Sequence, residues 1–288
     1  MKVKRFEARS GRGFRLSAHD PADTKGIGSK VEAEAQLAES TATMRELQER
    51  LYAQDRWSLL IVLQAMDAAG KDSTIKHVMS GLNPQGCEVH SFKAPSEEEL
   101  DHDFLWRTSV RLPRRGHIGL FNRSYYEEVL VVRVHPEILA RQKVPSGLVT
   151  KRVWDDRFED INQYEGYLAR NGTVIRKIFL HVSKEEQRRR FLARLEQPEK
   201  QWKFSMHDVE ERKLWRKYMR VYEEAIRATS TTHAPWYIVP ADHKWFSRLV
   251  VSRIIIEALE GLGLEFPALD PAQTRELAEV RRALESER

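Results

Sequence analysis

The sequence predicts an α/β fold in which a parallel sheet of about five strands lies between two layers of helices, an α/β/α sandwich. Two observations carry this prediction. Short continuous apolar runs recur along the chain, and segments with apolar residues at helical spacing alternate with them. A continuous apolar run of strand length is expected for a parallel strand that is buried on both faces.

Five apolar runs are expected to form the strands. They are residues 59–64, 88–92, 117–121, 174–182 and 236–239. Because ligands of such sheets bind at the carboxyl ends of the strands, the loops after these runs are where the chemistry is expected.

Helices are expected between the runs. Residues 31–54 repeat apolar side chains at helical spacing, and so do the segments 214–225 and 249–259. Ser96, with Glu99 three residues later, forms a capping box that begins another helix.

The last helix is expected to begin at Asp270-Pro271, where a capping residue precedes a proline. Its apolar residues, Leu277, Val280 and Leu284, are expected to face inward.

The chain is expected to form a single domain over residues 1–288. An irregular segment over 1–30, a lid insertion over 183–212 and the C-terminal helix over 264–288 are its expected additions to the core.

Composition indicates a globular protein with a polyanionic partner. The 288 residues are 41% hydrophobic and 32% charged, with a net charge of +5 and a pI near 9.2. This balance suits nucleic acid, phospholipid or polyphosphate alike. One cysteine excludes an internal disulfide and a cysteine zinc site. Because no apolar run reaches roughly 20 residues and no signal peptide is recognisable, a cytoplasmic location without membrane contact is expected.

A glycine-containing turn follows the first run. It reads QAMDAAGKDST over residues 64–74 and is similar to a Walker A phosphate loop, with Ala65 replacing the first glycine and Asp72 replacing serine or threonine. Small residues let backbone N–H groups turn toward phosphate oxygens, and Lys71 supplies a cation at the start of a helix. A tight turn with an incidental Gly-Lys pair is the alternative. The candidate phosphate-binding residues here are Ala68, Ala69, Gly70, Asp72, Ser73 and Thr74.

Magnesium is the expected cofactor, with manganese as a substitute. The hydroxyl that usually holds Mg²⁺ after the loop lysine is missing, but Asp67 and Asp72 offer carboxylates nearby. Asp67 is the first choice as a ligand.

A second polar cluster follows the third run. Asn122 stands where many P-loop enzymes carry an acid, and its carbonyl could bind magnesium-bound water. Arg123 could fork onto phosphate oxygens. Glu127 and Glu128 come next, where one could hold metal or orient an acceptor. They could equally be capping acids that complement a helix dipole.

A basic segment follows the fourth run. Ser183 and Glu186 form a second capping box, and Pro198 breaks the helix. A mobile lid that closes over a phosphate chain would have this order of helix, basic loop and helix. A solvated charged helix is the alternative. The candidate lid residues are Arg188, Arg190, Arg194 and Lys203.

Together these segments resemble the second family of polyphosphate kinases over roughly residues 30–262. The motifs that carry the resemblance are LQAMDAAGKD (63–72), NPQG (83–86), SFKAP (91–95), HDFLWR (102–107), FNRSYYEEVLV (121–131), WKF (202–204) and APWYIVPAD (234–242). The likeness is greatest to the one-domain subgroup that phosphorylates nucleoside monophosphates as well as diphosphates.

The resemblance implies a P-loop kinase-like core with a helical lid over a basic polyphosphate channel. It implies that Lys71 binds the transferred phosphoryl group, that Asp67 holds magnesium and that Arg123 binds phosphate. The family often has aspartate at the position of Glu128. A homo-oligomer, either dimer or tetramer, is expected, and nucleic acid is not an expected partner. Further phosphate- or nucleotide-binding candidates are Lys93, Asn122 and Arg133.

The predicted function is Mg²⁺-dependent transfer of a phosphoryl group from inorganic polyphosphate to AMP or ADP, or to the guanine equivalents. Mg²⁺ on Asp67, with Glu128 assisting, would bridge the phosphates, while Lys71 and Arg123 stabilise the moving group. The lid arginines and Lys203 would clamp the donor. Two alternatives stay open: an ATP-dependent nucleotide kinase of the thymidylate kinase type, and a catalytically inactive polyanion- or RNA-binding protein.

Overall fold

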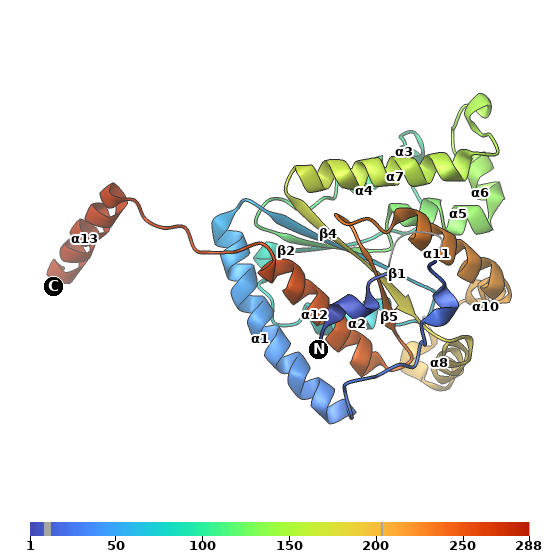
Figure 1. Ribbon diagram of the computed structural model, residues 1–288, viewed down its shortest axis with the longest axis horizontal. Coiled ribbons are helices and arrows are strands. Elements are labelled where there is room, and N and C mark those ends of the chain that lie inside the picture. Colours follow the sequence, from blue (N-terminus) through green and yellow to red (C-terminus); the bar gives the residue numbers. More distant parts are fainter. Residues whose placement is uncertain (9–12, 203, 288) are drawn as a thin grey trace.

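The computed structural model describes residues 1–8, 13–202 and 204–287. Its centre is a five-stranded sheet in the order β2-β3-β1-β4-β5, and every neighbouring pair is parallel (Figure 1). The strands are β1 (Ser58–Ala65), β2 (Cys87–Ser91), β3 (Ile118–Asn122), β4 (Thr173–His181) and β5 (Trp236–Pro240). Each strand matches its predicted run to within one residue at both ends, so the predicted α/β class and the five-stranded parallel sheet are confirmed.

The central strand brings the predicted functional loops together. β1 is buried along its whole length, as its continuous apolar sequence predicts. Leu63 of β1 pairs with Asn122 of β3, and Ala65 pairs with Leu180 of β4. The carboxyl ends of these three strands therefore meet at one edge of the sheet.

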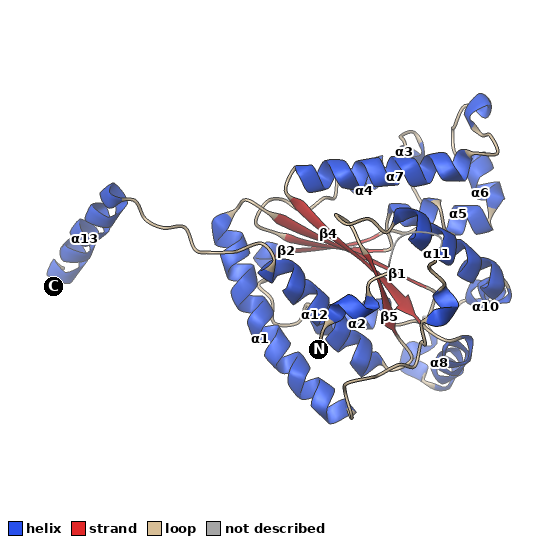
Figure 2. Cartoon of the chain, viewed as in Figure 1, coloured by secondary structure: helices blue, strands red, loops and turns tan. Residues whose placement is uncertain are grey.

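Helices cover both faces of the sheet (Figure 2). One face carries α1 (Lys30–Gln54), α2 (Lys71–Val78) and α12 (Lys244–Glu260), and the other carries α7 (Val153–Arg170) and α11 (Trp215–Thr229). Most side chains of α12 are buried because it packs against α1 as well as the sheet.

Short elements connect these layers. The short helices before and after β3 are α3 (Glu97–Leu100), α4 (Trp106–Ser109), α5 (Val131–Val134) and α6 (Pro136–Arg141). The 3₁₀ turns are η1 (Val3–Phe6), η2 (Leu16–Ala18), η3 (Pro84–Gly86), η4 (Tyr125–Glu128) and η5 (Ser146–Leu148). The predicted capping box of Ser96 and Glu99 is present and begins α3.

In the segment where a helix, a basic loop and a helix were expected, the structure has a further short helix within the expected loop. After β4 the chain forms α8 (Lys184–Glu196), α9 (Pro198–Gln201) and α10 (Met206–Lys213). The Ser183 hydroxyl accepts a bond from the Glu186 amide at 3.0 Å, but the Glu186 carboxylate pairs with Arg190 instead of completing a capping box.

The N-terminal segment, which was expected to be irregular, contributes side chains to the hydrophobic core. Its apolar side chains are buried because it packs beside β5 and α12: the Ala8 amide donates to the Trp236 carbonyl at 2.7 Å. Those buried residues are Val3, Phe6, Ala8, Phe14, Leu16 and Ile27.

The C-terminal helix corrects a prediction. α13 (Pro271–Ser286) begins at the predicted cap Asp270, which also forms a capping box with Gln273, but the helix extends away from the body of the molecule (Figure 1). Leu277, Val280 and Leu284, predicted to face inward, are 53%, 48% and 61% exposed. The chain between Gly261 and Asp270 leads outward, so the apolar stripe of α13 meets no core.

Of the helices in the described ranges, none combines the length and the apolar character that crossing a membrane requires.

Candidate active site at the carboxyl edge of the sheet

The turn between β1 and α2 has the backbone shape of a phosphate-binding loop. Ala68 and Gly70 both lie in the left-handed region, with φ of 58° and 109°. Glycine reaches this region without cost, whereas alanine is strained there, so surrounding contacts must hold Ala68 in place. The first N–H groups of α2 have no acceptor within the helix and are available to an anion at this end.

The carbonyls of this loop point toward α8. Gln187 donates to the Asp67 carbonyl at 2.9 Å, and Arg190 donates to the carbonyls of Ala68 and Ala69 at 3.0 and 2.6 Å. Three consecutive carbonyls are thus occupied on the outer side of the turn.

Lys71 lies at the base of the loop. Its ammonium donates to the carbonyls of Ala65 and Met66 at 2.8 and 3.3 Å. Burial, and then the nearby charge of Arg123, lower the pKa of Lys71, while Asp67 and Glu127 act in the opposite direction. Lys71 is therefore a desolvated cation whose charge is supported by carboxylates around it.

Arg123 bridges two acids beside the loop. It follows β3 with a φ of 65°, and its guanidinium contacts Asp67 at 3.0 Å and Glu127 at 2.9 Å. The charge of Glu127 is the main reason that the pKa of Arg123 is raised. This contact forms because the ends of β1 and β3 are adjacent in the sheet.

Asn122 joins the loop to β2. Its amide nitrogen donates to Asp72 at 2.9 Å and to Ser91 at 3.3 Å. Its side-chain carbonyl oxygen is buried and has no hydrogen-bond partner among the described residues. An unpartnered buried acceptor beside a carboxylate fits a water or ion at this position.

Glu128 does not point into this group, which corrects the expectation that it assists Asp67. Its carboxylate accepts from Gln142 at 2.5 Å and pairs with Arg157 at 3.4 Å, and only 5% of the residue is exposed. Burial raises the pKa of Glu128, against the lowering effects of Gln142 and Arg157. The 3₁₀ turn that contains both acids sends Glu127 to Arg123 and Glu128 to the opposite side.

The lid arginines differ in their surroundings. Arg194 is 24% exposed and pairs with Asp208 of α10 at 3.5 Å, whereas Arg188 is 60% exposed and pairs with Glu185. Burial, followed by the charge of Asp67, raises the pKa of Asp208, so this part of the lid faces the loop. Arg190 is buried against the loop, and Lys203 lies outside the described residues.

The remaining candidates are dispersed. Lys93 is exposed just after β2, at the same edge of the sheet. Arg133 pairs with Glu224 at 2.5 Å and lies over the rings of Trp154 and Phe158, away from the loop. Thr74 is buried in α2, and the Ser73 hydroxyl accepts from Arg248 at 2.7 Å.

Sequence analysis missed the loop contact of Gln187. It lies three residues before Arg190 in α8, so both side chains share the helix face that packs on the loop. The spacing of three residues between Gln187 and Arg190 could therefore have predicted this contact.

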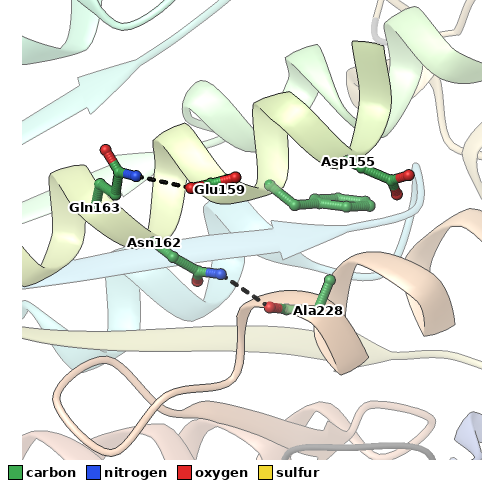
Figure 3. A pocket seen from close by; sticks show the side chains of 6 residues that line it. Asp155, Glu159, Asn162, Gln163 and Ala228 are labelled. Atoms are coloured by element: carbon green, nitrogen blue, oxygen red, sulfur yellow. Dashed lines mark hydrogen bonds between the residues drawn. The ribbon is translucent and has the colours of Figure 1, made fainter. Parts of the chain in front are cut away.

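The best-formed hollows of the described residues lie elsewhere. A hollow of about 480 Å³ lies between α7 and the end of α11, where Asn162 donates to the Ala228 carbonyl (Figure 3). Another, of about 470 Å³, is lined by Leu16, His181 and Trp215 among others. Neither hollow includes a residue of the loop after β1.

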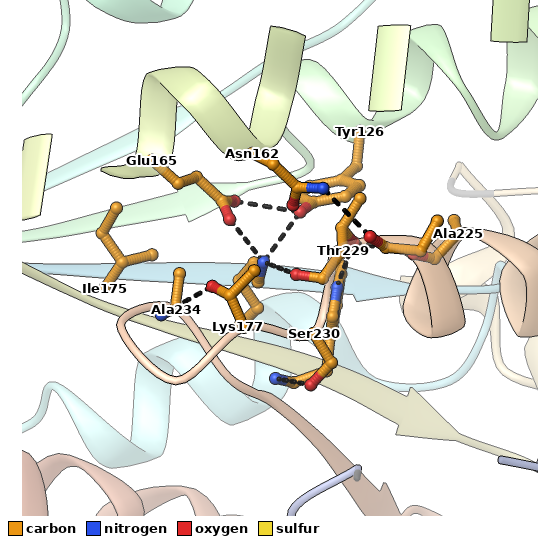
Figure 4. Close-up of polar contacts among 12 residues, drawn as sticks. Tyr126, Asn162, Glu165, Ile175, Lys177, Ala225, Thr229, Ser230 and Ala234 are labelled. Atoms are coloured by element: carbon orange, nitrogen blue, oxygen red, sulfur yellow. Dashed lines mark hydrogen bonds and ion pairs between the residues drawn. The ribbon is translucent and has the colours of Figure 1, made fainter. Parts of the chain in front are cut away.

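A closed polar network lies behind the site (Figure 4). Lys177 of β4 donates to Glu165 at 2.5 Å, to the Tyr126 hydroxyl at 2.9 Å and to the Thr229 carbonyl at 2.6 Å. Glu165 also accepts from the hydroxyls of Tyr125 and Tyr126 at 2.8 and 2.9 Å. The network fixes the turn η4, whose Glu127 reaches the site.

This arrangement suits the binding and transfer of a phosphoryl group. A loop with inward N–H groups, a lysine at its base and an arginine between two acids can align and neutralise phosphates. Within residues 1–8, 13–202 and 204–287, no three His, Cys, Asp or Glu side chains are grouped to hold a metal ion. Magnesium does not need such a group, since it keeps several waters and uses one or two carboxylates with substrate phosphates.

Known proteins share this sequence and fold. Over 285 residues the chain is 49% identical to the ADP-polyphosphate phosphotransferase of Rhodopseudomonas palustris, covering 99% of both chains. It is 45% identical to the AMP/ADP-polyphosphate phosphotransferase of Meiothermus ruber, covering 95% of this chain and 98% of that one. The crystal structure of polyphosphate kinase 2 from Arthrobacter aurescens TC1 matches with a TM-score of 0.85 and 42% identity, over 94% of each chain.

The sequence model of one family matches most of the chain. That family is polyphosphate kinase 2, and the match extends over residues 28–266, from the start of α1 past the end of α12. With these relatives, the match shows that the chain belongs to the polyphosphate kinase 2 family.

Proposed function

We propose that this protein transfers a phosphoryl group from inorganic polyphosphate to AMP, ADP or both, or to the equivalent guanine nucleotides. The activities for which two relatives that match nearly the whole chain are named support the donor and acceptor class. One observation of the structure carries the proposal: Lys71, Asp67, Arg123 and Glu127 converge on a loop with the backbone of a phosphate cradle.

The chain's own residues would act by alignment and charge. The loop amides and Lys71 bind the phosphoryl group during its transfer. Arg123 neutralises the negative charge that spreads over the equatorial oxygens of that group. Glu127 holds the Arg123 guanidinium in orientation through the 2.9 Å contact. An ionised acceptor phosphate needs no strong general base, so the acids of the site, Asp67 and Glu127, can serve to hold Arg123.

A divalent metal is part of this proposal. Kinases of this family in general depend on a divalent metal, and Mg²⁺, with Mn²⁺ as a substitute, suits the oxygen donors here. Asp67 would bind the ion, and the unpartnered side-chain carbonyl of Asn122 would accept from one of its waters. When bound, the ion supplies positive charge to the donor and acceptor phosphates.

The lid would contact the donor through its exposed side. Arg194 and Arg188 are both partly exposed and belong to helix α8, which follows β4 at the edge of the site. Their proposed role is to attract and hold the polyphosphate chain, as clustered cations do for polyanions.

A donor–acceptor matrix tests the function. Purified protein is incubated with polyphosphate or ATP as donor and with AMP, ADP, GMP or GDP as acceptor, and products are separated by ion-exchange chromatography. We expect ADP to form from AMP and polyphosphate without ATP, EDTA to stop the reaction and excess Mg²⁺ to restore it.

The other outcomes identify the competing functions. Turnover with ATP but with no polyphosphate would identify a nucleotide kinase of another donor class. Absence of turnover with every donor, together with salt-sensitive binding of RNA, would identify a polyanion-binding protein.

A further inference from the structure

Arg190 differs from the arginines beside it in α8. The side chains of Arg188 and Arg189 are 60% and 74% exposed, whereas that of Arg190 is 8% exposed. A charged side chain that is buried to this extent needs acceptors for its donors.

Every N–H group of the Arg190 guanidinium has an acceptor. Nε donates to Glu186 at 2.6 Å, and one terminal nitrogen donates to the carbonyls of Ala68 and Ala69 at 3.0 and 2.6 Å. The other terminal nitrogen donates to the carbonyls of Ala241 and Asp242 at 2.6 and 3.0 Å. Since a guanidinium has five N–H groups, these five contacts use all of them.

Gln187 extends the same contact surface. Its amide nitrogen donates to the Asp67 carbonyl at 2.9 Å, and its carbonyl oxygen accepts from Arg212 of α10 at 3.0 Å. Side chains from one turn of α8 therefore hold three consecutive carbonyls of the phosphate loop, and Arg190 also ties the loop to the segment after β5.

These contacts decide which way the loop amides face. A peptide's N–H points opposite to its carbonyl, so carbonyls held toward α8 turn the amides of Ala68 and Gly70 toward the inside of the loop, while the Ala69 amide donates to the Met66 carbonyl at 3.3 Å. They also hold Ala68 in a left-handed conformation that alanine otherwise avoids.

We propose that Arg190, assisted by Gln187, is a positioning residue that orients the phosphate loop for transfer, and not a ligand of the polyphosphate chain. The inference rests on the proposed function, because it assigns a role within the same site. It separates Arg190 from Arg194, which is 24% exposed and makes its ion pair with Asp208 at 3.5 Å.

The test is kinetics across donor chain length. Wild type, Arg190→Ala and Arg194→Ala are assayed with ADP and with donors from tripolyphosphate to long-chain polyphosphate. We expect Arg190→Ala to lower kcat by about 100-fold at every donor length, because a misplaced loop impairs the step itself. For Arg194→Ala we expect a rise in KM that grows with donor length, and little change in kcat.

Two further measurements separate positioning from a purely structural role. Added methylguanidine should restore part of the kcat of Arg190→Ala by refilling the vacated site, and it should not affect Arg194→Ala. Arg189→Ala is the matched control, since it removes an exposed arginine of the same helix, and we expect its kcat to stay within about twofold of wild type.

Each outcome bears on the proposal. A loss in Arg190→Ala that appears only in KM and only with long donors would overturn it, and so would unchanged kcat. If Arg190→Ala fails to fold, Gln187→Met tests the same idea through the Asp67 carbonyl alone: a tenfold lower kcat supports positioning, and unaltered kcat refutes it. Wild type that turns over ATP but not polyphosphate would refute the proposed function, and the Arg190 series would then be run with ATP.

Discussion

Two charged clusters share the turn after β3, and they differ in how completely they are closed. Arg123 with Asp67 and Glu127 is partly open, with side chains 37%, 28% and 14% exposed. Lys177 with Glu165 is 0% exposed on both sides. A ligand can reach the open cluster, whereas all N–H groups of the Lys177 ammonium in the buried cluster donate to protein acceptors.

This difference in exposure indicates that the Arg123 cluster serves catalysis and that the Lys177 cluster stabilises the fold. The buried ammonium has three N–H groups and three acceptors, so it holds β4, α7 and η4 in one arrangement. The charged side chains of the open cluster pair with one another but remain partly exposed, so a phosphate can still approach them. A variant of the buried cluster should therefore lose stability first, and a variant of the open cluster should lose activity first.

The largest effect is expected for Lys177→Met. Removal of the ammonium leaves the Glu165 carboxylate buried without its counter-ion, and we expect the free energy of unfolding to fall by about 3–5 kcal/mol. Urea unfolding followed by circular dichroism measures the change. In the double variant Lys177→Met/Glu165→Gln, much of the loss should be recovered. A loss below about 1 kcal/mol in the single variant would contradict the closed-network interpretation.

Lys71→Ala should have the second largest effect, on turnover instead of stability. We expect kcat to fall by at least about 100- to 1000-fold, since the variant removes a desolvated cation at the transferred group. Steady-state assays with polyphosphate and ADP measure it. Lys76→Ala, an exposed lysine of the same helix, is the matched control and should retain wild-type kcat. Near-normal turnover of Lys71→Ala in a folded protein would remove the basis of the proposed site.

The same comparison shows which features of the fold and of the site could be predicted from the sequence. Continuous apolar runs located all five strands, and the adjacency of β1 and β3 in the sheet brings Asp67, Lys71 and Arg123 close to one another. The direction of a side chain within a 3₁₀ turn is not encoded in spacing alone. Glu127 and Glu128 are neighbours in sequence, yet one faces Arg123 and the other Arg157.

Burial of charge was the other feature that the sequence did not reveal. Arg190 lies within a run of three arginines and was expected to clamp the donor, but its two terminal nitrogens donate to backbone carbonyls of two distant loops. Carbonyl acceptors carry no residue signature. In the same way, the apolar stripe of α13 predicted a buried face, because periodicity reports that a helix has such a face and not whether the fold provides a surface for it.

Arg123→Lys should have an intermediate effect. Lysine keeps the charge and the same cost of a left-handed backbone at this position, but it cannot reach two acids with a planar fork. We expect kcat to fall by about 10- to 100-fold and the free energy of unfolding to change by less than about 1 kcal/mol. Arg152→Lys, in an exposed ion pair with Asp156, is the control. A loss of stability as large as that of Lys177→Met would mean that the open cluster, like the buried one, mainly stabilises the fold.

The smallest effect is expected for Glu128→Gln and depends on pH. Burial raises the pKa of Glu128 above its ordinary 4.5, so the folded state keeps this proton at pH values where the unfolded state has lost it. Stability from this group is therefore present below about pH 4.5 and is lost as pH rises through the raised pKa. Glutamine does not titrate, so the difference in unfolding free energy, wild type minus variant, should decrease as pH rises across this window. Urea unfolding of both proteins between pH 4 and 8 measures that difference, in which all other acids cancel. A difference that increases with pH would show that the effects of Arg157 and Gln142 on the pKa of Glu128 outweigh that of burial.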